Sequence, residues 1–245
     1  MKACFIAAIV PAFALSGASL AQSAAFPMPP SDWPAPVHDN PSIPFIFLDR
    51  FEYRLAKGAD ARMWDVQGWV GGDYDKLWVK SEGESKGART EQGDLQALYA
   101  RRVSPFWYLQ SGVRAHLQPE PSRNSLVLAV QGLAPYWFDV EASAFLDEQG
   151  RLSARFEAAY DLLFSQRLVL QPRIESNFSA AADRERGLGS GLNDIELGLR
   201  LRYEFYRQFA PYIGVNWSRK VGGTAREQNE EIRETSIVIG VRAWF

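Results

Sequence analysis

Side chains that could bind a transition metal are few in this chain, which contains 2 His and 3 Met. His116 lies in an extended run, where it could act as a metal ligand together with Met63 or a carboxylate. A hydrogen-bonded or solvated histidine is the favoured alternative. Met28 and His38 are further candidate ligands, and an incidental pair is favoured there as well. No spacing typical of zinc ligands is present.

Catalysis has little support in the residue types. The single cysteine, Cys4, lies in the N-terminal apolar segment. A nucleophile would therefore be Ser or Thr activated by His116, for instance Ser125 with an acid. One histidine without defined partners does not make a triad. The stretch Gly187–Gly191 lies between extended runs and does not open a helix, as a phosphate-binding loop would. We predict that the protein is not an enzyme, with a hydrolase as the least favoured reading.

A larger set of charged residues alternates with apolar residues and is predicted to share the inner face of extended runs. The set comprises Glu82, Arg114, Asp139, Glu141, Arg155, Glu157, Asp161, Arg173, Glu175, Glu196, Arg200, Arg202, Glu204 and Arg242. Both signs occur on neighbouring runs, so we interpret the set first as a network of salt bridges that plugs a barrel interior. The alternative is a narrow polar path for ions or small solutes.

The runs that must position these charges have the period of two that is typical of β-strands. Clear alternation covers 137–146, 152–162, 168–178, 194–205 and 213–218, whereas runs near 45–55, 63–70, 75–84, 94–102, 106–118 and 124–132 fit less cleanly. Strands that cross a bilayer need about 9–11 residues, and soluble strands mostly have about 5–6. We therefore predict an all-β fold, a closed antiparallel transmembrane β-barrel of about 12 strands. A soluble β-sandwich is the alternative.

The connections and the last run favour the membrane barrel. If both termini are periplasmic, short turns near 71–74, 103–105, 133–135, 164–166 and 206–208 share one rim, while most connections at the other rim are longer, as in outer-membrane barrels. Aromatic residues gather near the ends of the runs, where rings meet lipid headgroups. The last run, Thr235–Phe245, alternates and ends on an aromatic. This ending resembles the recognition signal of outer-membrane barrel assembly.

The N-terminus predicts export. Lys2 precedes the apolar residues Cys4–Leu15, and small residues lead to a cleavage site after Ala21, as in a secretory signal peptide. We predict a signal peptide over 1–21, a Pro-rich leader over 22–44 and an outer-membrane β-barrel over 45–245, in a Gram-negative bacterium. The expected partners are outer-membrane lipid, lipopolysaccharide and the barrel-assembly machinery. A net charge of −2 gives no reason to expect nucleic acid.

Several stretches resemble the outer-membrane copper-resistance protein B family. They are Trp64–Asp73 (WDVQGWVGGD), Lys76–Glu84 (KLWVKSEGE), Val130–Phe138 (VQGLAPYWF), Tyr160–Leu163 (YDLL), Gly187–Leu192 (GLGSGL), Glu196–Glu204 (ELGLRLRYE) and Phe209–Trp217 (FAPYIGVNW). The resemblance, from about Phe45 to Phe245, implies a role in copper tolerance through binding or moving copper. It implies copper ions as the bound metal, with Met28, His38, Met63 and His116 as candidate copper ligands. A periplasmic copper protein is a candidate partner.

The chain departs from this family ahead of the barrel, where the family typically carries a segment rich in Met and His. That segment is short here and offers only Met28 and His38. Storage of several copper ions is therefore not encoded, because thioether and imidazole are the groups that suit copper. The leading hypothesis is a barrel for copper resistance. The alternatives are a narrow general channel or structural barrel without metal specificity, and an outer-membrane hydrolase that uses His116.

Overall fold

The computed structural model describes residues 41–57, 60–87, 89–118, 122–183, 186–227 and 233–245. The expected signal peptide (1–21) lies outside these residues, as does most of the expected leader (22–44). The strands are β1 (Ile43–Ala56), β2 (Ala61–Gly71), β3 (Asp75–Lys86), β4 (Arg89–Ser104), β5 (Trp107–Gln118), β6 (Arg123–Ala134), β7 (Phe138–Asp147), β8 (Leu152–Ala159), β9 (Leu162–Leu163), β10 (Leu168–Ser179), β11 (Gly191–Tyr203), β12 (Phe209–Lys220) and β13 (Arg233–Trp244). A 3-10 turn, η1 (Pro135–Trp137), and a short helix, α1 (Thr224–Glu227), occur in connections.

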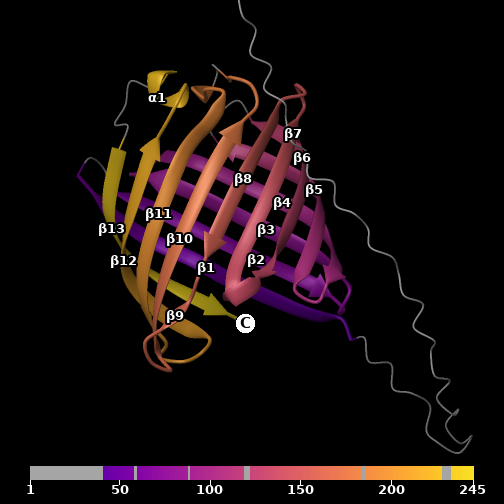
Figure 1. Cartoon of the computed structure of the whole chain (residues 1–245), viewed down its shortest axis with the longest axis vertical. Helices are drawn as coiled ribbons and strands as arrows, with labels where there is room; N and C mark the ends of the chain where they lie inside the picture. Colours follow the sequence, from indigo (N-terminus) through magenta and orange to yellow (C-terminus); the bar gives the residue numbers. More distant parts are fainter. Residues whose placement is uncertain (1–40, 58–59, 88, 119–121, 184–185, 228–232) are drawn as a thin grey trace, which may run out of the picture. The chain divides into compact units, whose positions relative to one another are not determined.

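The strands form one antiparallel sheet that closes on itself (Figure 1). Strand β1 pairs with both β2 and β13. The backbones of Ile46 and Phe245 exchange two hydrogen bonds of 3.0 and 2.9 Å, so the last residue of the chain takes part in the closure. Because β9 continues the line of β8 along β10, the described strands occupy twelve positions around the barrel. The prediction of a closed barrel of about 12 strands is confirmed.

The outer surface of the barrel is apolar, because alternate residues of each strand point away from the interior. In β6, for example, Leu126 and Leu128 are 61% and 56% exposed, whereas Val127 and Ala129 are 4% and 2% exposed. The described strands other than β8 and β9 have between 10 and 16 residues. Long strands with an apolar outer face are typical of a barrel that spans a bilayer. None of the helices in the described ranges is long and apolar enough to cross a membrane.

The two rims of the barrel differ. The rim that holds both ends of the barrel has short connections, at 72–74, 105–106, 135–137, 164–167 and 204–208. Exposed aromatic side chains gather at this rim: Tyr74, Phe106, Tyr136, Trp137, Phe164, Phe205, Tyr206 and Phe245. The longest connections follow β10 and β12, which end at the opposite rim. Short turns with an aromatic girdle are typical of the periplasmic side of such barrels.

Among the irregularities of the described strands, two affect how the interior is built. The register of β1 shifts between Leu48 and Phe51, and this bulge turns both Asp49 and Arg50 toward interior partners. The second lies in 152–162, which alternates like a single strand but is divided into β8 and β9. The ladder breaks opposite Pro172 of β10. Proline has no N–H to donate, so the break falls where a ladder bond cannot form.

The interior has an apolar part and a charged part. Trp78, Leu98, Ala100, Val127, Ala129 and Phe145 form the apolar cluster, on β3 to β7. Buried charged residues such as Arg50, Glu52, Arg173 and Arg200 lie on β1, β10 and β11. The barrel therefore encloses a filled interior, in which an apolar cluster lies on β3 to β7 and charged residues occupy much of the remaining space.

Candidate functional site

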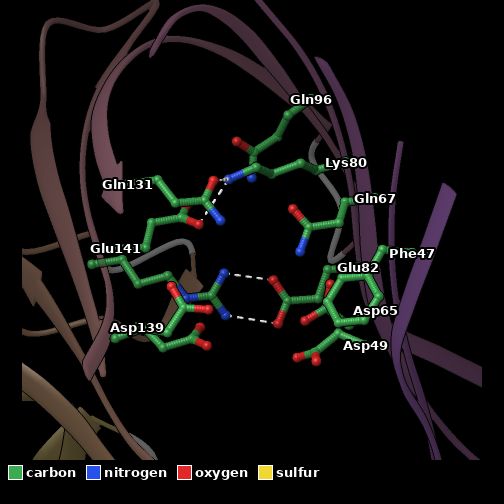
Figure 2. A pocket seen from close by; sticks show the side chains of 12 residues that line it. Phe47, Asp49, Asp65, Gln67, Lys80, Glu82, Gln96, Gln131, Asp139 and Glu141 are labelled. Carbon is green, nitrogen blue, oxygen red and sulfur yellow. Dashed lines mark hydrogen bonds and ion pairs between the residues drawn. The ribbon is translucent and has the colours of Figure 1, made fainter. Parts of the chain in front are cut away.

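One ion pair joins opposite walls of the barrel. Arg155 of β8 donates to both carboxylate oxygens of Glu82 on β3, at 2.5 and 2.7 Å (Figure 2). Arg155 also lies 2.5 Å from Glu175, and Glu82 accepts a hydrogen bond of 3.2 Å from Arg50. Each of these buried charges thus has a partner of opposite sign, which offsets the cost of removing it from water.

A second network joins β1 to β11. Arg200 donates to Glu52 at 2.6 Å, and Arg54 donates to Glu196 at 3.0 Å. Further interior pairs are Lys80–Glu141 (2.7 Å), Arg173–Glu157 (2.5 Å), Arg202–Asp161 (2.8 Å), Arg202–Glu204 (3.6 Å) and Arg242–Asp49 (3.2 Å). Some of these pairs, such as Lys80–Glu141, join strands that are not neighbours, and others, such as Arg202–Glu204, are local. Many of the interior charges are therefore held by ion pairs.

Met63 lies in the second network. The guanidinium of Arg54 approaches its thioether sulfur to 2.7 Å. A positive charge at this distance opposes the binding of a metal cation to the same sulfur. His116 contacts other residues, so the structure does not bring these two predicted copper ligands together. Met28 and His38 lie outside the described residues.

His116 belongs to a charged group near the outer rim. Its Nδ1 contacts the carboxylate of Asp94, which also pairs with Arg114. Arg186 lies 3.4 Å from the same nitrogen. Two guanidinium groups near the imidazole oppose a bound cation. Ser125 is opposite Arg114 in the β5–β6 register, and the contacts of the imidazole involve carboxylate and guanidinium groups. The local geometry is that of a salt-bridge cluster.

A cavity of about 70 Å³ remains between the walls (Figure 2). It is lined by Phe47, Asp49, Asp65, Gln67, Lys80, Glu82, Gln96, Gln131, Asp139, Glu141, Arg155 and Glu157. Six of these side chains are carboxylates, and two, Lys80 and Arg155, carry a positive charge. Carboxylates outnumber the cations among the lining residues, but Arg50, Arg173 and Arg242 pair with three of them from outside the lining, so the excess of negative charge is small.

The charges of the predicted set lie inside the barrel. Each has an interior ion-pair partner among the described residues except Asp139, which lines the cavity. In the described part of the chain no group of three or more His, Cys, Asp and Glu is arranged to hold a metal ion. The interior offers separate carboxylates rather than a ready ligand cage.

Sequence reasoning missed several interior charges: Asp49, Arg50, Glu52, Arg54, Asp65, Lys80 and Asp94. The bulge in β1 hides the first four, because the alternation changes phase there. The charge of these residues is the signal in the sequence that could have placed them in the interior. Seven charged residues in otherwise apolar strands of a membrane barrel point to the interior, since a charge facing lipid is costly.

Comparison with known proteins gives the family. The model of the copper resistance protein B precursor family matches residues 42–245. The copper resistance protein B homolog of Pseudomonas syringae pv. tomato is 43% identical over 212 residues, which cover 85% of this chain and 72% of the relative. Copper resistance protein B of Escherichia coli is 40% identical over the same shares of the two chains.

A solved porin structure supports the fold. The NanC porin superposes with a TM-score of 0.56 at 15% identity, over 80% of this chain and 98% of the porin. At this identity the likeness concerns the fold, which is that of an outer-membrane barrel, and the location predicted for the chain agrees with it. The chain belongs to the copper resistance protein B family of Gram-negative outer-membrane barrels.

Proposed function

We propose that the barrel serves in copper resistance by binding copper ions in its interior and moving them across the outer membrane, with copper as cargo and without enzymatic turnover. The carboxylate-lined cavity is the observation that carries this proposal. Negative charge inside low-dielectric walls concentrates cations and repels anions. Family membership supports copper as the relevant cation.

Exchange of ion pairs is the step that would let a cation pass. A copper ion that approaches Glu82 competes with Arg155 and Arg50 for the carboxylate. The freed guanidinium groups can turn to Glu175 and Asp65, which they already contact. Cation binding and opening of the interior are therefore coupled in this proposal.

Deletion of the gene tests the role in copper resistance. We expect the deletion strain to change its copper tolerance and its copper content, and the full-length gene to restore both. The same measurements of tolerance and cell content with zinc and nickel distinguish a role in copper resistance from a general increase in the permeability of the envelope. If copper tolerance and cell copper both stay unchanged, the proposed function is wrong.

The dense ion-pair network favours a second candidate function, a narrow general channel or a structural barrel without metal specificity. Pairs such as Arg155–Glu82 and Arg200–Glu52 would stiffen the barrel without any cargo. Conductance of the purified protein in a planar bilayer distinguishes the two candidates. A potassium current that copper leaves unchanged favours the general channel, and block of this current by copper favours the copper barrel.

The route to the membrane is part of the same proposal. We expect removal of residues 1–21, insertion by the barrel-assembly machinery, and copper exchange with a periplasmic copper protein. Mass spectrometry of the mature protein should then give an N-terminus at Gln22. A mature chain that still contains residues 1–21 would contradict this expectation.

A further inference from the structure

The outer face of β11, β12 and β13 carries very little charge. These strands are neighbours in the sheet (Figure 1), and alternate residues of each strand face away from the interior. The outward residues are Ile195, Leu197, Leu199, Leu201 and Tyr203 of β11, Pro211, Ile213, Val215, Trp217 and Arg219 of β12, and Arg233, Thr235, Ile237, Ile239 and Val241 of β13. In this set of described residues, Arg219 and Arg233 are the only charged side chains. The face therefore has two positive charges and no carboxylate.

The two arginines lie directly opposite each other. Arg219 is the register partner of Arg233 in the β12–β13 ladder, and both residues are exposed. Neither has an ion pair or a side-chain hydrogen bond with another residue in the described part of the chain. Like charges directly opposite each other on one face of a sheet are destabilising. A negatively charged group between the two guanidinium groups would replace this repulsion with attraction.

The arginine pair lies near the rim opposite the short turns, at the end of β12 and the start of β13. Toward the middle of the barrel the next outward pair is Trp217 with Thr235, and the one after it is Val215 with Ile237, which are both exposed. The charges therefore stand at the edge of an apolar band. An arginine on the lipid face is costly at the middle of a bilayer and costs little near the interface. The depth of the pair is that of the headgroups of the outer leaflet.

The geometry of two facing guanidinium groups limits what the ligand can be. Arginine binds phosphate through two parallel N–H···O bonds. A phosphomonoester has three oxygens and a charge of about −1.5 to −2, so one such group can bridge two arginines. A phosphodiester has a single charge, which balances only one of them. Lipopolysaccharide, the glycolipid expected around this barrel, joins phosphomonoesters to several acyl chains. Its chemistry matches a pair of arginines above an apolar surface.

We propose that Arg219 and Arg233 form a binding site for a phosphate group of lipopolysaccharide, whose acyl chains lie along the apolar outer face of β12 and β13. One phosphomonoester bridges the two guanidinium groups, and Trp217 lies at the boundary between the headgroup and the chains. The site is on the outside of the barrel and does not depend on copper as cargo. It goes beyond the proposed function, because it concerns how the barrel is held in its leaflet.

Native mass spectrometry of the full mature protein in detergent tests the site. The probes are lipid A (the phosphorylated and acylated disaccharide of lipopolysaccharide), lipid A without its phosphates, phosphatidylglycerol, and inorganic phosphate. The variant is Arg219→Gln/Arg233→Gln, which removes both charges and keeps polar side chains. Arg101→Gln is the matched control, because Arg101 is also an exposed arginine of the outer face but lies opposite Asp75 at the rim with short turns.

We expect the wild type and Arg101→Gln to bind lipid A equally well, and Arg219→Gln/Arg233→Gln to bind it at least about tenfold more weakly, since charge-assisted hydrogen bonds are lost. Lipid A without phosphates and phosphatidylglycerol should bind the wild type as weakly as lipid A binds the double variant. Equal affinity of the wild type and the double variant for lipid A overturns the inference. So does equal affinity of the wild type for lipid A with and without phosphates, or for phosphatidylglycerol, and these comparisons need no variant. Inorganic phosphate that binds as tightly as lipid A would show a site for free phosphate and would also overturn the inference.

Thermal unfolding gives a second measurement, in which a purely structural role has a different outcome. In detergent without lipid A, Arg219→Gln/Arg233→Gln should unfold at the same temperature as the wild type or at a higher one, because the repulsion between the arginines is gone. Added lipid A should raise the unfolding temperature of the wild type, since it binds the folded state, and should raise that of the double variant less. If the double variant is destabilised to the same extent with and without lipid A, the arginines support the barrel itself, and the lipid site is wrong.

Discussion

The guanidinium of Arg155 and the carboxylate of Glu82 meet across the barrel in a two-bonded pair, with N···O distances of 2.5 and 2.7 Å. Their strands, β8 and β3, are separated by four strands in one direction and by the remaining wall of the barrel in the other. The pair is therefore a strut between nearly opposite walls. It also crosses the cavity that both residues line (Figure 2).

Removal of this strut should weaken the barrel and widen its interior. In Glu82→Gln, Arg155 and Arg50 lose a charged partner while they stay buried. We expect the free energy of unfolding to fall by about 3 kcal/mol, the lower end for a broken buried pair. Urea unfolding in detergent measures this change. The double variant Glu82→Ala/Arg155→Ala should in addition conduct more potassium in a planar bilayer.

Glu148→Gln is the control for this strut, because Glu148 accepts a hydrogen bond from Asn124 at an exposed rim position. Glu148→Gln should change the free energy of unfolding by less than about 1 kcal/mol. Equal losses for Glu82→Gln and Glu148→Gln, with an unchanged conductance of the double variant, would contradict the role of the strut.

The sequence predicts the architecture better than the interior contacts. Alternation in 194–205 is complete because β11 has a charged inner face and an apolar outer face. In β6 both faces are apolar, since Val127 points to the interior cluster and Leu128 points outward, so the period of two is weak there. The pairing of Arg155 with Glu82 was not predictable from the sequence. The two residues are 73 positions apart, and they meet only because the sheet closes into a barrel.

The free-energy cost of placing a charge on the outer surface should depend on how deep the charge lies in the membrane. Val113 and Leu117 share the outer face of β5 and are 53% and 55% exposed, one near the middle of the strand and one near its end. We expect Val113→Arg to lower the free energy of unfolding by about 2–4 kcal/mol and Leu117→Arg to lower it by about 0–1 kcal/mol. Unfolding from lipid vesicles measures both. An equal loss of unfolding free energy in the two variants would argue against a bilayer around this surface.

Gly112 should tolerate no side chain, because a Cβ there would lie 2.0 Å from the carbonyl oxygen of Ala97 and 2.8 Å from the Cα of Leu98. We expect Gly112→Ala to push β4 and β5 apart and to lower the free energy of unfolding by about 1–3 kcal/mol. Gly93→Ala is the matched control on β4, where the nearest atom is 3.7 Å away. The measurement is unfolding in urea. A cost for Gly93→Ala as large as that for Gly112→Ala would show that the close approach at Gly112 is unimportant.

The last residue should decide how efficiently the barrel assembles. Phe245 exchanges two backbone hydrogen bonds with Ile46 where β13 meets β1, and its ring is 76% exposed. Removal of Phe245 deletes both the closing bonds and the aromatic end of the chain, whereas Phe245→Ala keeps the bonds. If the assembly machinery reads the ring, both variants should lower the folded fraction in the outer membrane, measured by heat-dependent gel mobility. Phe205→Ala, an exposed aromatic at the same rim, should not. A loss confined to the deletion would mean that closure by the backbone, and not recognition of the ring, limits assembly.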